Sequence, residues 1–254
     1  MKSWILTYHS LDDSGSVISL HPAVFRQHIS WLVQTRTQVV PLDQILESPG
    51  AVALTFDDGF RNFYEHALPV LQRYRLPATV FVVSGFCGGK NDWPSQPAVP
   101  RVPTLPLMSW SELQELAAAG ISLGSHTINH PRLGALSAAD TEEELRASQK
   151  TIEDRTGKPV ISFAYPYGEA TPQIREAVRK RFRVACGTKL AYVSPESDAA
   201  ELPRLDTFYV QKKLWFEGLG SQYGTAYIAA RSALRELRSG WNRKSRSRKP
   251  SSTK

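Results

Sequence analysis

Short apolar runs alternate with longer segments of helical periodicity along most of this 254-residue chain. Six apolar runs are expected to be β-strands: 5–8, 51–56, 78–83, 121–124, 160–165 and 184–186. The main helices are expected at 22–34, 62–74, 111–119, 137–156, 172–181 and 227–238. Such alternation is typical of βαβ units, in which a helix returns the chain so that the next strand runs parallel. The chain is therefore predicted to have an α/β fold with a parallel sheet.

The number of repeats favours a barrel over an open sheet. Seven or so strand–helix units over roughly 235 residues suit a TIM-like (β/α) barrel, whose functional residues follow the carboxyl ends of the strands. Four groups of polar residues stand at such positions: His9, the pair Asp57 and Asp58, His126, and the segment Tyr165–Gly168. We therefore expect the active site at this end of the barrel.

Two neighbouring carboxylates, Asp57 and Asp58, end the second expected strand and precede Gly59. Neighbouring residues within a strand point to opposite faces, so both can serve one site only where the strand ends. Gly59 permits the sharp turn that this requires. The structural alternative is that the Asp-Gly pair only forms a tight turn or caps a helix.

Two histidines, His126 and His130, are four residues apart, as in a helical metal-binding pair. Pro131 argues against a helix here, because proline pushes the preceding residue away from the α region. The pair is therefore expected to span a turn after a strand. Either histidine alone could be structural, but two imidazoles and a carboxylate at neighbouring strand ends favour a metal site.

The ligand types narrow the choice of metal and suggest the reaction. Two imidazoles and one carboxylate suit Zn²⁺, Co²⁺, Ni²⁺ or Fe²⁺ better than Mg²⁺ or Ca²⁺. Such a metal lowers the pKa of bound water from about 15.7 towards about 7 and polarises a carbonyl group. The second aspartate is then free to act as a general base. These residues predict a metal-assisted hydrolase.

Two further features could complete the chemistry of amide hydrolysis. His9 is a candidate acid for the departing nitrogen, because histidine changes charge near neutral pH, although it could instead cap a turn. The Tyr165–Gly168 segment could offer a backbone N–H to a developing oxyanion, although its sequence alone indicates no more than a turn.

Taken together, these residues resemble the motifs of polysaccharide deacetylases of carbohydrate esterase family 4, which contain a NodB-homology domain. The resemblance rests on the segments Thr55–Gly59, Ser125–His130 and Phe163–Gly168, and it covers most of residues 1–210. It implies a distorted (β/α) barrel of about seven strands. It also implies metal-dependent removal of N-acetyl groups from amino sugars such as N-acetylglucosamine (GlcNAc).

The resemblance also implies roles for individual residues. Asp57 would be the general base, and the metal, most often zinc, would be held by Asp58, His126 and His130. The backbone N–H of Tyr167 would stabilise the oxyanion. The neighbouring residues that would bind substrate are Tyr165, Pro166 and Gly168.

The sequence departs from the family pattern at two places. Ala164 stands where the family often has an arginine that orients the base, and Arg204 is a candidate replacement. The late Leu-x-His motif with the general acid is absent, because no histidine follows His130. A permuted subgroup, the exopolysaccharide poly-N-acetylglucosamine deacetylases, takes this acid from a Tyr-His pair near the N-terminus. Tyr8-His9 matches that pair.

The net charge of +7 comes from one end of the chain. Residues 238–254 contain seven lysines or arginines and no acid, so they are expected to form a disordered basic tail. Weak contact with an anionic membrane surface or with a polyanion is the alternative, whereas a specific nucleic-acid partner is not expected. Residues 1–237 would form the catalytic domain, with 84–108, rich in proline and glycine, as a loop insertion.

The expected location is cytoplasmic, because the sequence shows neither a signal peptide nor an apolar run near the ~20 residues that span a bilayer. Cys87 and Cys186 have no metal-binding spacing and are expected to be free thiols. The oligomeric state is left open by the sequence.

Two other functions use the same residues or the same fold. One is a deacylase or deformylase that acts on another amide or on a nucleotide sugar, and only its groove would differ. The other is a non-catalytic carbohydrate-binding protein, with Trp93 or Trp110 as a stacking platform. The second has no use for the two aspartates and two histidines, so the sequence favours an N-deacetylase acting on a GlcNAc-containing glycan or glycan precursor.

Overall fold

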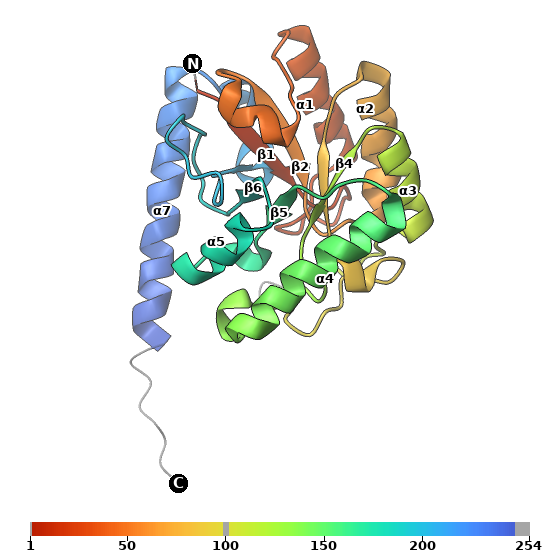
Figure 1. Ribbon diagram of the computed structural model, residues 1–254. Helices are drawn as coiled ribbons and strands as arrows, with labels where there is room; N and C mark the ends of the chain where they lie inside the picture. Colours follow the sequence, from red (N-terminus) through yellow and green to blue (C-terminus); the bar gives the residue numbers. More distant parts are fainter. Residues whose placement is uncertain (1, 99–101, 247–254) are drawn as a thin grey trace.

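The computed structural model describes residues 2–98 and 102–246, and its centre is one sheet of seven parallel strands (Figure 1). The strand order is β6-β5-β4-β3-β2-β1-β7. The strands are β1 Trp4–Tyr8, β2 Val52–Phe56, β3 Thr79–Val82, β4 Ser122–Ser125, β5 Ser162–Ala164, β6 Val184–Cys186 and β7 Leu205–Asp206. All six predicted strands are present. The seventh, β7, pairs with β1 through Leu6 and Leu205 and is too short for the sequence pattern to reveal.

The segment that precedes β7 brings the two ends of the sheet together. Leu202 forms an isolated parallel bridge with Cys186 at the end of β6. Its N–H donates to the Ala185 carbonyl (2.7 Å), and its carbonyl accepts the Gly187 N–H (2.9 Å). Within three residues the chain then pairs with β1 on the other edge. The sheet therefore curves into a distorted barrel, as predicted.

Helices follow the strands and cover the outside of this barrel (Figure 1). The α-helices are α1 Pro22–Gln34, α2 Leu68–Tyr74, α3 Trp110–Ala118, α4 Ala138–Thr156, α5 Pro172–Arg179, α6 Lys213–Glu217 and α7 Gln222–Arg246. The short helices are η1 Leu42–Glu47, η2 Phe63–Ala67, η3 Ser84–Phe86, η4 Leu133–Ala135, η5 Pro166–Gly168 and η6 Thr207–Val210. The expected start of α4 is confirmed, because the Ser137 hydroxyl accepts the Asp140 N–H.

The single helix expected at 62–74 is divided into a π-helix, η2, and the α-helix α2. The cause is Pro69, which has no N–H and whose ring clashes with the carbonyl four residues earlier in a regular α-helix. The N–H of Leu68 instead reaches back to the Phe63 carbonyl, five residues away. The wider turn accommodates the proline without ending the helix.

Alternate residues of the strands divide the core into two parts. Leu54 and Phe56 of β2 pack into the large cluster under the helices, whereas Ala53 belongs to a second cluster with Ile5 and Phe81. Because side chains alternate along a strand, this second cluster lies on the other face, inside the barrel.

The C-terminal helix α7 runs from Gln222 to Arg246, whereas the sequence predicted a helix over 227–238. It thus includes the first nine residues of the expected tail at 238–254, and residues 247–254 lie outside the described residues. No described helix is both long enough and apolar enough to cross a bilayer. Both cysteines are free, Cys186 buried and Cys87 half-buried.

Candidate active site

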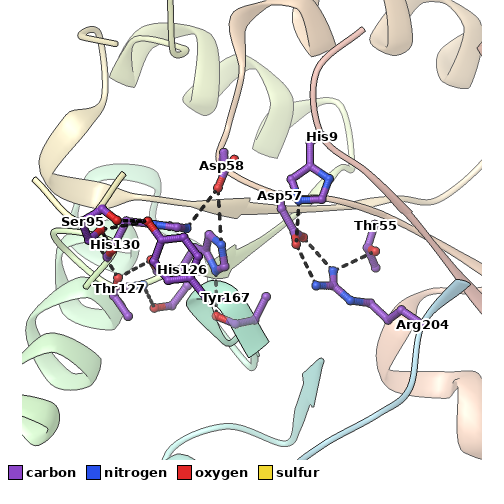
Figure 2. A network of polar contacts seen from close by, with 12 residues as sticks. His9, Thr55, Asp57, Asp58, Ser95, His126, Thr127, His130, Tyr167 and Arg204 are labelled. Atoms are coloured by element: carbon purple, nitrogen blue, oxygen red, sulfur yellow. Dashed lines mark hydrogen bonds and ion pairs between the residues drawn. The ribbon is translucent and has the colours of Figure 1, made fainter. Parts of the chain in front are cut away.

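Three buried side chains converge at the carboxyl ends of β2 and β4: Asp58, His126 and His130 (Figure 2). One carboxylate oxygen and one ring nitrogen from each histidine all lie within 4.8 Å of one another. The Nε2 atoms of His126 and His130 are each 3.4 Å from Asp58 Oδ1. Ligands about 2.0–2.1 Å from a tetrahedral zinc are separated by about 3.4 Å. The three residues therefore fit a divalent metal in both donor type and spacing.

Backbone contacts fix the orientation of the first histidine ring. His126 Nδ1 lies 2.7 Å from the carbonyl oxygen of Ala164, at the end of β5. A proton on Nδ1 donated to this carbonyl leaves Nε2 with its lone pair directed at Asp58, the usual arrangement for a metal ligand. Ala164 thus contributes through its backbone, although its side chain is not the arginine that this place often holds in related motifs.

The turn between the histidines has an unusual backbone, because Thr127 (φ 69°) and His130 (φ 50°) are both left-handed. Glu144, on α4, stabilises it. One Glu144 carboxylate oxygen accepts the N–H groups of Ile128 (2.7 Å) and Asn129 (3.1 Å), and the other accepts the Asn129 side-chain amide (2.7 Å). The expected turn is therefore confirmed, and a buried helix residue holds it in place.

Burial and charge act differently on the metal-facing groups. Burial lowers the pKa of His130 to about 3, so this ring is neutral at ordinary pH. Burial would raise the pKa of Asp58, but the neighbouring imidazoles of His126, His130 and His9 outweigh it and lower the pKa. An ionised carboxylate and a neutral imidazole are the protonation states in which both bind a metal.

Asp57 points away from this cluster, into the mouth of the barrel, where it meets Arg204 (Figure 2). Two parallel hydrogen bonds of 2.7 Å join the guanidinium to both carboxylate oxygens, and both side chains are buried. Arg204 is itself held by the Gly187 carbonyl (3.0 Å) and the Thr55 hydroxyl (3.3 Å). The predicted candidate for the orienting arginine is therefore in direct contact with the expected base.

The ion pair decides the protonation state of Asp57. Burial would raise the pKa of this carboxyl group, but the charge and hydrogen bonds of Arg204, helped by His9 and His126, hold it well below its usual range. Asp57 is therefore ionised and able to accept a proton.

The side chains of Asp57 and Asp58 point in different directions because the chain turns where β2 ends. Asp58 is left-handed (φ 71°) and is followed by Gly59, which is also left-handed (φ 75°).

His9 follows β1 and lies beside Asp57, with its Nε2 3.7 Å from Asp57 Oδ2. Its side chain is 24% exposed, and it lines the same cavity as the metal-facing residues. This position lets the ring approach a substrate and exchange protons there.

The Tyr165–Gly168 segment follows β5 and turns at Tyr167, which is left-handed (φ 58°). Gly168 is also left-handed, and a Cβ atom there would lie 2.0 Å from the Thr188 hydroxyl, so a larger residue would be strained and would displace Thr188. Tyr165 and Tyr167 line the cavity, whereas Pro166 and Gly168 are not among its lining residues. Of the residues expected to bind substrate, Tyr165 has the most direct access.

A cavity of about 200 Å³ lies over these groups, and the 84–108 insertion forms part of its wall. Trp93 stacks on the His130 ring, with centroids 4.3 Å apart. The Ser95 hydroxyl donates to the His130 carbonyl, and the Tyr167 hydroxyl donates to the Ser95 carbonyl (2.9 Å). The insertion is thus an ordered cover that touches a metal-facing histidine, apart from residues 99–101, which lie outside the described residues.

Sequence reasoning did not identify several residues that support the site. Thr55 accepts a hydrogen bond from Arg204, and Glu144 holds the turn between the two histidines. Trp93, expected only as a possible sugar platform, stacks on His130. The available signal for Glu144 was an acidic residue on the buried stripe of α4. Thr55 belongs to the Thr55–Gly59 motif, but the motif gave it no role, and Trp93 carried no signal for contact with His130, because both roles depend on contacts between distant segments.

Comparison with known families agrees with this geometry. The sequence model of the polysaccharide deacetylase family matches residues 47–181, which is more than half of the chain. The chain belongs to the polysaccharide deacetylase family. This region contains Asp57, Asp58, both metal-facing histidines and the Tyr165–Gly168 segment, whereas His9 and Arg204 lie outside it.

Two curated relatives extend the similarity. The chain is 28% identical over 184 residues to YxkH of Bacillus subtilis strain 168, an alignment that covers 69% of this chain and 60% of that protein. It is 26% identical over 218 residues to a poly-beta-1,6-N-acetyl-D-glucosamine N-deacetylase of Staphylococcus aureus strain N315, covering 78% of this chain and 72% of the relative. The predicted resemblance to poly-N-acetylglucosamine deacetylases is thereby confirmed.

A solved structure supports the fold assignment. IcaB from Ammonifex degensii superposes with a TM-score of 0.69 at 24% identity, and the match covers 85% of this chain and 97% of that one. At this identity the likeness shows the fold alone. It confirms the predicted distorted (β/α) barrel.

Proposed function

We propose that this chain is a metal-dependent N-deacetylase that removes acetyl groups from a GlcNAc-containing polysaccharide or glycan precursor. Family membership supports the reaction type, and the S. aureus relative, a poly-beta-1,6-N-acetyl-D-glucosamine N-deacetylase, supports the substrate class. The observation that carries the proposal is the convergence at one cavity of the metal-facing triad and of Asp57, which Arg204 holds. Residues 1–237 are proposed as the catalytic domain.

The metal would be held by Asp58, His126 and His130, with zinc as the first candidate and cobalt, nickel or iron as alternatives. When bound, it would polarise the acetyl carbonyl and lower the pKa of a nearby water molecule. The two histidines would bind through Nε2, the nitrogen that faces Asp58 in each ring.

The remaining chemistry belongs to the protein's own side chains. Asp57 is ionised and takes a proton from the water molecule that attacks the acetyl carbon. Arg204 is a positioning residue, because its two hydrogen bonds hold both oxygens of that carboxylate. Its positive charge also keeps Asp57 free of a proton before the reaction begins.

Two groups act on the substrate's atoms as the amide breaks. The backbone N–H of Tyr167 donates to the acetyl oxygen as it gains negative charge. His9 gives a proton to the departing amine, so that the C–N bond breaks to yield acetate and a free amino sugar. Tyr165 lines the side of the cavity where the sugar binds, and Pro166 and Gly168, which do not line it, form the turn beside it.

The test is acetate release by the metal-loaded protein from short acetylated GlcNAc oligomers and, separately, from nucleotide-linked GlcNAc. Release from the oligomers that is lost in Asp57→Asn supports the proposal. Release only from the nucleotide sugar would replace the substrate class and favour the alternative small-molecule deacylase. Binding of oligomers without release from either would favour the non-catalytic carbohydrate-binding protein. The cytoplasmic location stays a prediction.

A further inference from the structure

The positive charge of this protein is concentrated at its C-terminal end. Residues 222–254 contain nine lysines and arginines and one acidic residue, Glu236. The preceding residues, 1–221, contain 22 basic and 23 acidic residues and are therefore close to neutral. Such an asymmetry produces a local positive potential that attracts anionic surfaces. Most of this segment is the helix α7.

The same helix exposes an apolar stripe. Tyr223 (49% exposed), Leu234 (49%) and Leu237 (71%) are 11 and 3 residues apart, so they lie on one face of a helix with 3.6 residues per turn. Leu214 of α6 (65% exposed) lies beside them, because the Tyr223 hydroxyl donates to its carbonyl. These four are among nine large apolar side chains exposed in the described structure, and they include the two most exposed.

Other residues of α7 hold it against the protein. Ile228 is buried in the core, and Tyr227 stacks on Trp215 with ring centroids 4.0 Å apart. Arg235 donates to the Thr188 carbonyl (2.8 Å) and lines a cavity of about 330 Å³ that also reaches His9. The helix is therefore anchored, and Figure 1 shows it as the outermost element on one side of the molecule.

Basic residues border the stripe directly. Arg231 and Arg238 are three residues before and four residues after Leu234, so they are its neighbours on the helix surface, and both are exposed. An apolar stripe next to basic side chains, here Arg231 and Arg238, is the pattern of a helix that lies in the interface of an anionic bilayer. Nucleic-acid binding needs the positive charge but has no use for the leucines. A second copy of the chain would bring two strongly basic helices together.

We propose that α7 docks this protein on an anionic phospholipid surface. Tyr223, Leu234 and Leu237 enter the headgroup region, and the flanking Arg231 and Arg238 contact lipid phosphates. The docking face is distinct from the side of α7 that carries Arg235 at the catalytic cavity. The inference is independent of the reaction that the site performs.

The experiment is co-sedimentation of the full chain with phosphatidylcholine vesicles and with mixed phosphatidylcholine–phosphatidylglycerol vesicles. Binding is expected only to the mixed vesicles and should weaken at high salt. Leu234→Ser with Leu237→Ser should reduce the affinity at least about tenfold, because the inserted apolar area is lost. Arg238→Gln with Arg243→Gln should reduce it about 30-fold, the equivalent of about 2 kcal/mol.

Matched controls remove the same kinds of group elsewhere. Val33→Ser with Tyr74→Ser removes two exposed apolar side chains, and Arg73→Gln with Lys158→Gln removes two exposed charges. Both should bind vesicles like the wild type, and circular dichroism should show all four variants folded.

Four results would overturn the proposal. Two concern the vesicles: no binding to the mixed vesicles, or an equal loss of vesicle affinity in the control variants. The others are binding to a free polyanion such as heparin without binding to vesicles, and a dimer that the leucine variant converts to monomers while vesicle binding is unchanged.

Discussion

The two halves of the site are built from different parts of the chain. The metal-facing half, Asp58 with His126 and His130, comes from the ends of β2 and β4 and spans 73 residues inside the family-matched region. The other half, for which we propose proton transfer, joins His9, Asp57 and Arg204, which span most of the chain, and two of its three members lie outside that region. Short motifs therefore describe the first half, and only the closed barrel assembles the second.

The halves also differ in how their carboxylates are neutralised. Asp57 has a permanent cation, the Arg204 guanidinium, at hydrogen-bonding distance of both oxygens. Asp58 faces two imidazoles, one of which is neutral because burial lowers the pKa of His130 to about 3. A buried charge needs a partner, so the negative charge of Asp58 is the one available to a metal ion. Two adjacent residues thus have separate tasks.

Asp57→Asn is expected to have the largest effect that separates the two halves. Acetate release should fall by about 10²–10⁴-fold, because the amide cannot accept the proton of the attacking water. The metal content should equal that of the wild type, because Asp57 does not face the metal ligands. Activity assays together with elemental analysis test this, and a variant that lost both activity and metal would mean that the halves are not separate.

His9→Ala should reduce kcat by about 10²-fold, because the departing amine would then take its proton from solvent. Metal content should again be unchanged. His21→Ala is a matched control, since His21 caps α1 and does not line the cavity. Near-normal turnover of the His9 variant would show that another group supplies the proton.

Arg204→Met should destabilise the fold and shift the pH dependence of the reaction. Removal of one partner of a buried ion pair costs about 3–5 kcal/mol of unfolding free energy. In the folded wild type the pKa of Asp57 is lowered, so the pair stabilises the protein above the unfolded pKa of about 3.9 and loses this contribution as the pH falls. Without Arg204, burial raises the pKa of Asp57. As the pH is lowered, the variant should therefore lose activity at a higher pH than the wild type does.

Denaturant unfolding and a pH–rate profile measure these two effects. Arg175→Met is the matched control, because Arg175 pairs with Glu201 in a partly exposed position, where such pairs are worth about 0–1 kcal/mol. An acid limb at the same pH in the Arg204 variant and in the wild type would contradict the assigned positioning role.

Glu144→Gln should have the smallest effect and should act on the metal half alone. The variant keeps the size of the side chain but weakens its three hydrogen bonds to the turn that carries His130. Loss of a group that orients a metal ligand typically lowers metal affinity by about 10–100-fold. Glu144 contacts the turn and not the His130 ring, so we expect a loss of metal affinity at the lower end, about tenfold. Calorimetric metal titration checks this. An unchanged affinity would mean that the histidine turn holds its shape without Glu144.

The fold was largely predictable because its repeats are local. The six longer strands and α1 could be placed from apolar runs and helical periodicity, and α1 has the predicted bounds, Pro22–Gln34. β7 could not, since two residues carry no pattern and Leu205–Asp206 is a strand only because β1 is beside it. The π-turn before Pro69 and the length of α7 likewise depend on packing around them.

The site divides in the same way. Asp57, Asp58 and the histidine pair were identifiable because each stands at a predicted strand end. Arg204 is 147 residues from Asp57, and its contact depends on closure of the barrel, so the sequence could offer it only as a candidate from family resemblance. Glu144 and Trp93 were recognised as supports only from their contacts with the histidine turn and the His130 ring.

Metal stoichiometry in dialysed protein tests the central claim most directly. The wild type and Asp57→Asn should each retain about one divalent ion per chain, whereas Asp58→Asn should retain almost none, because three protein ligands are the usual minimum for a catalytic zinc site. Equal metal content in all three proteins would contradict the assignment of Asp58, His126 and His130 as the ligands, and with it the proposed hydrolytic function.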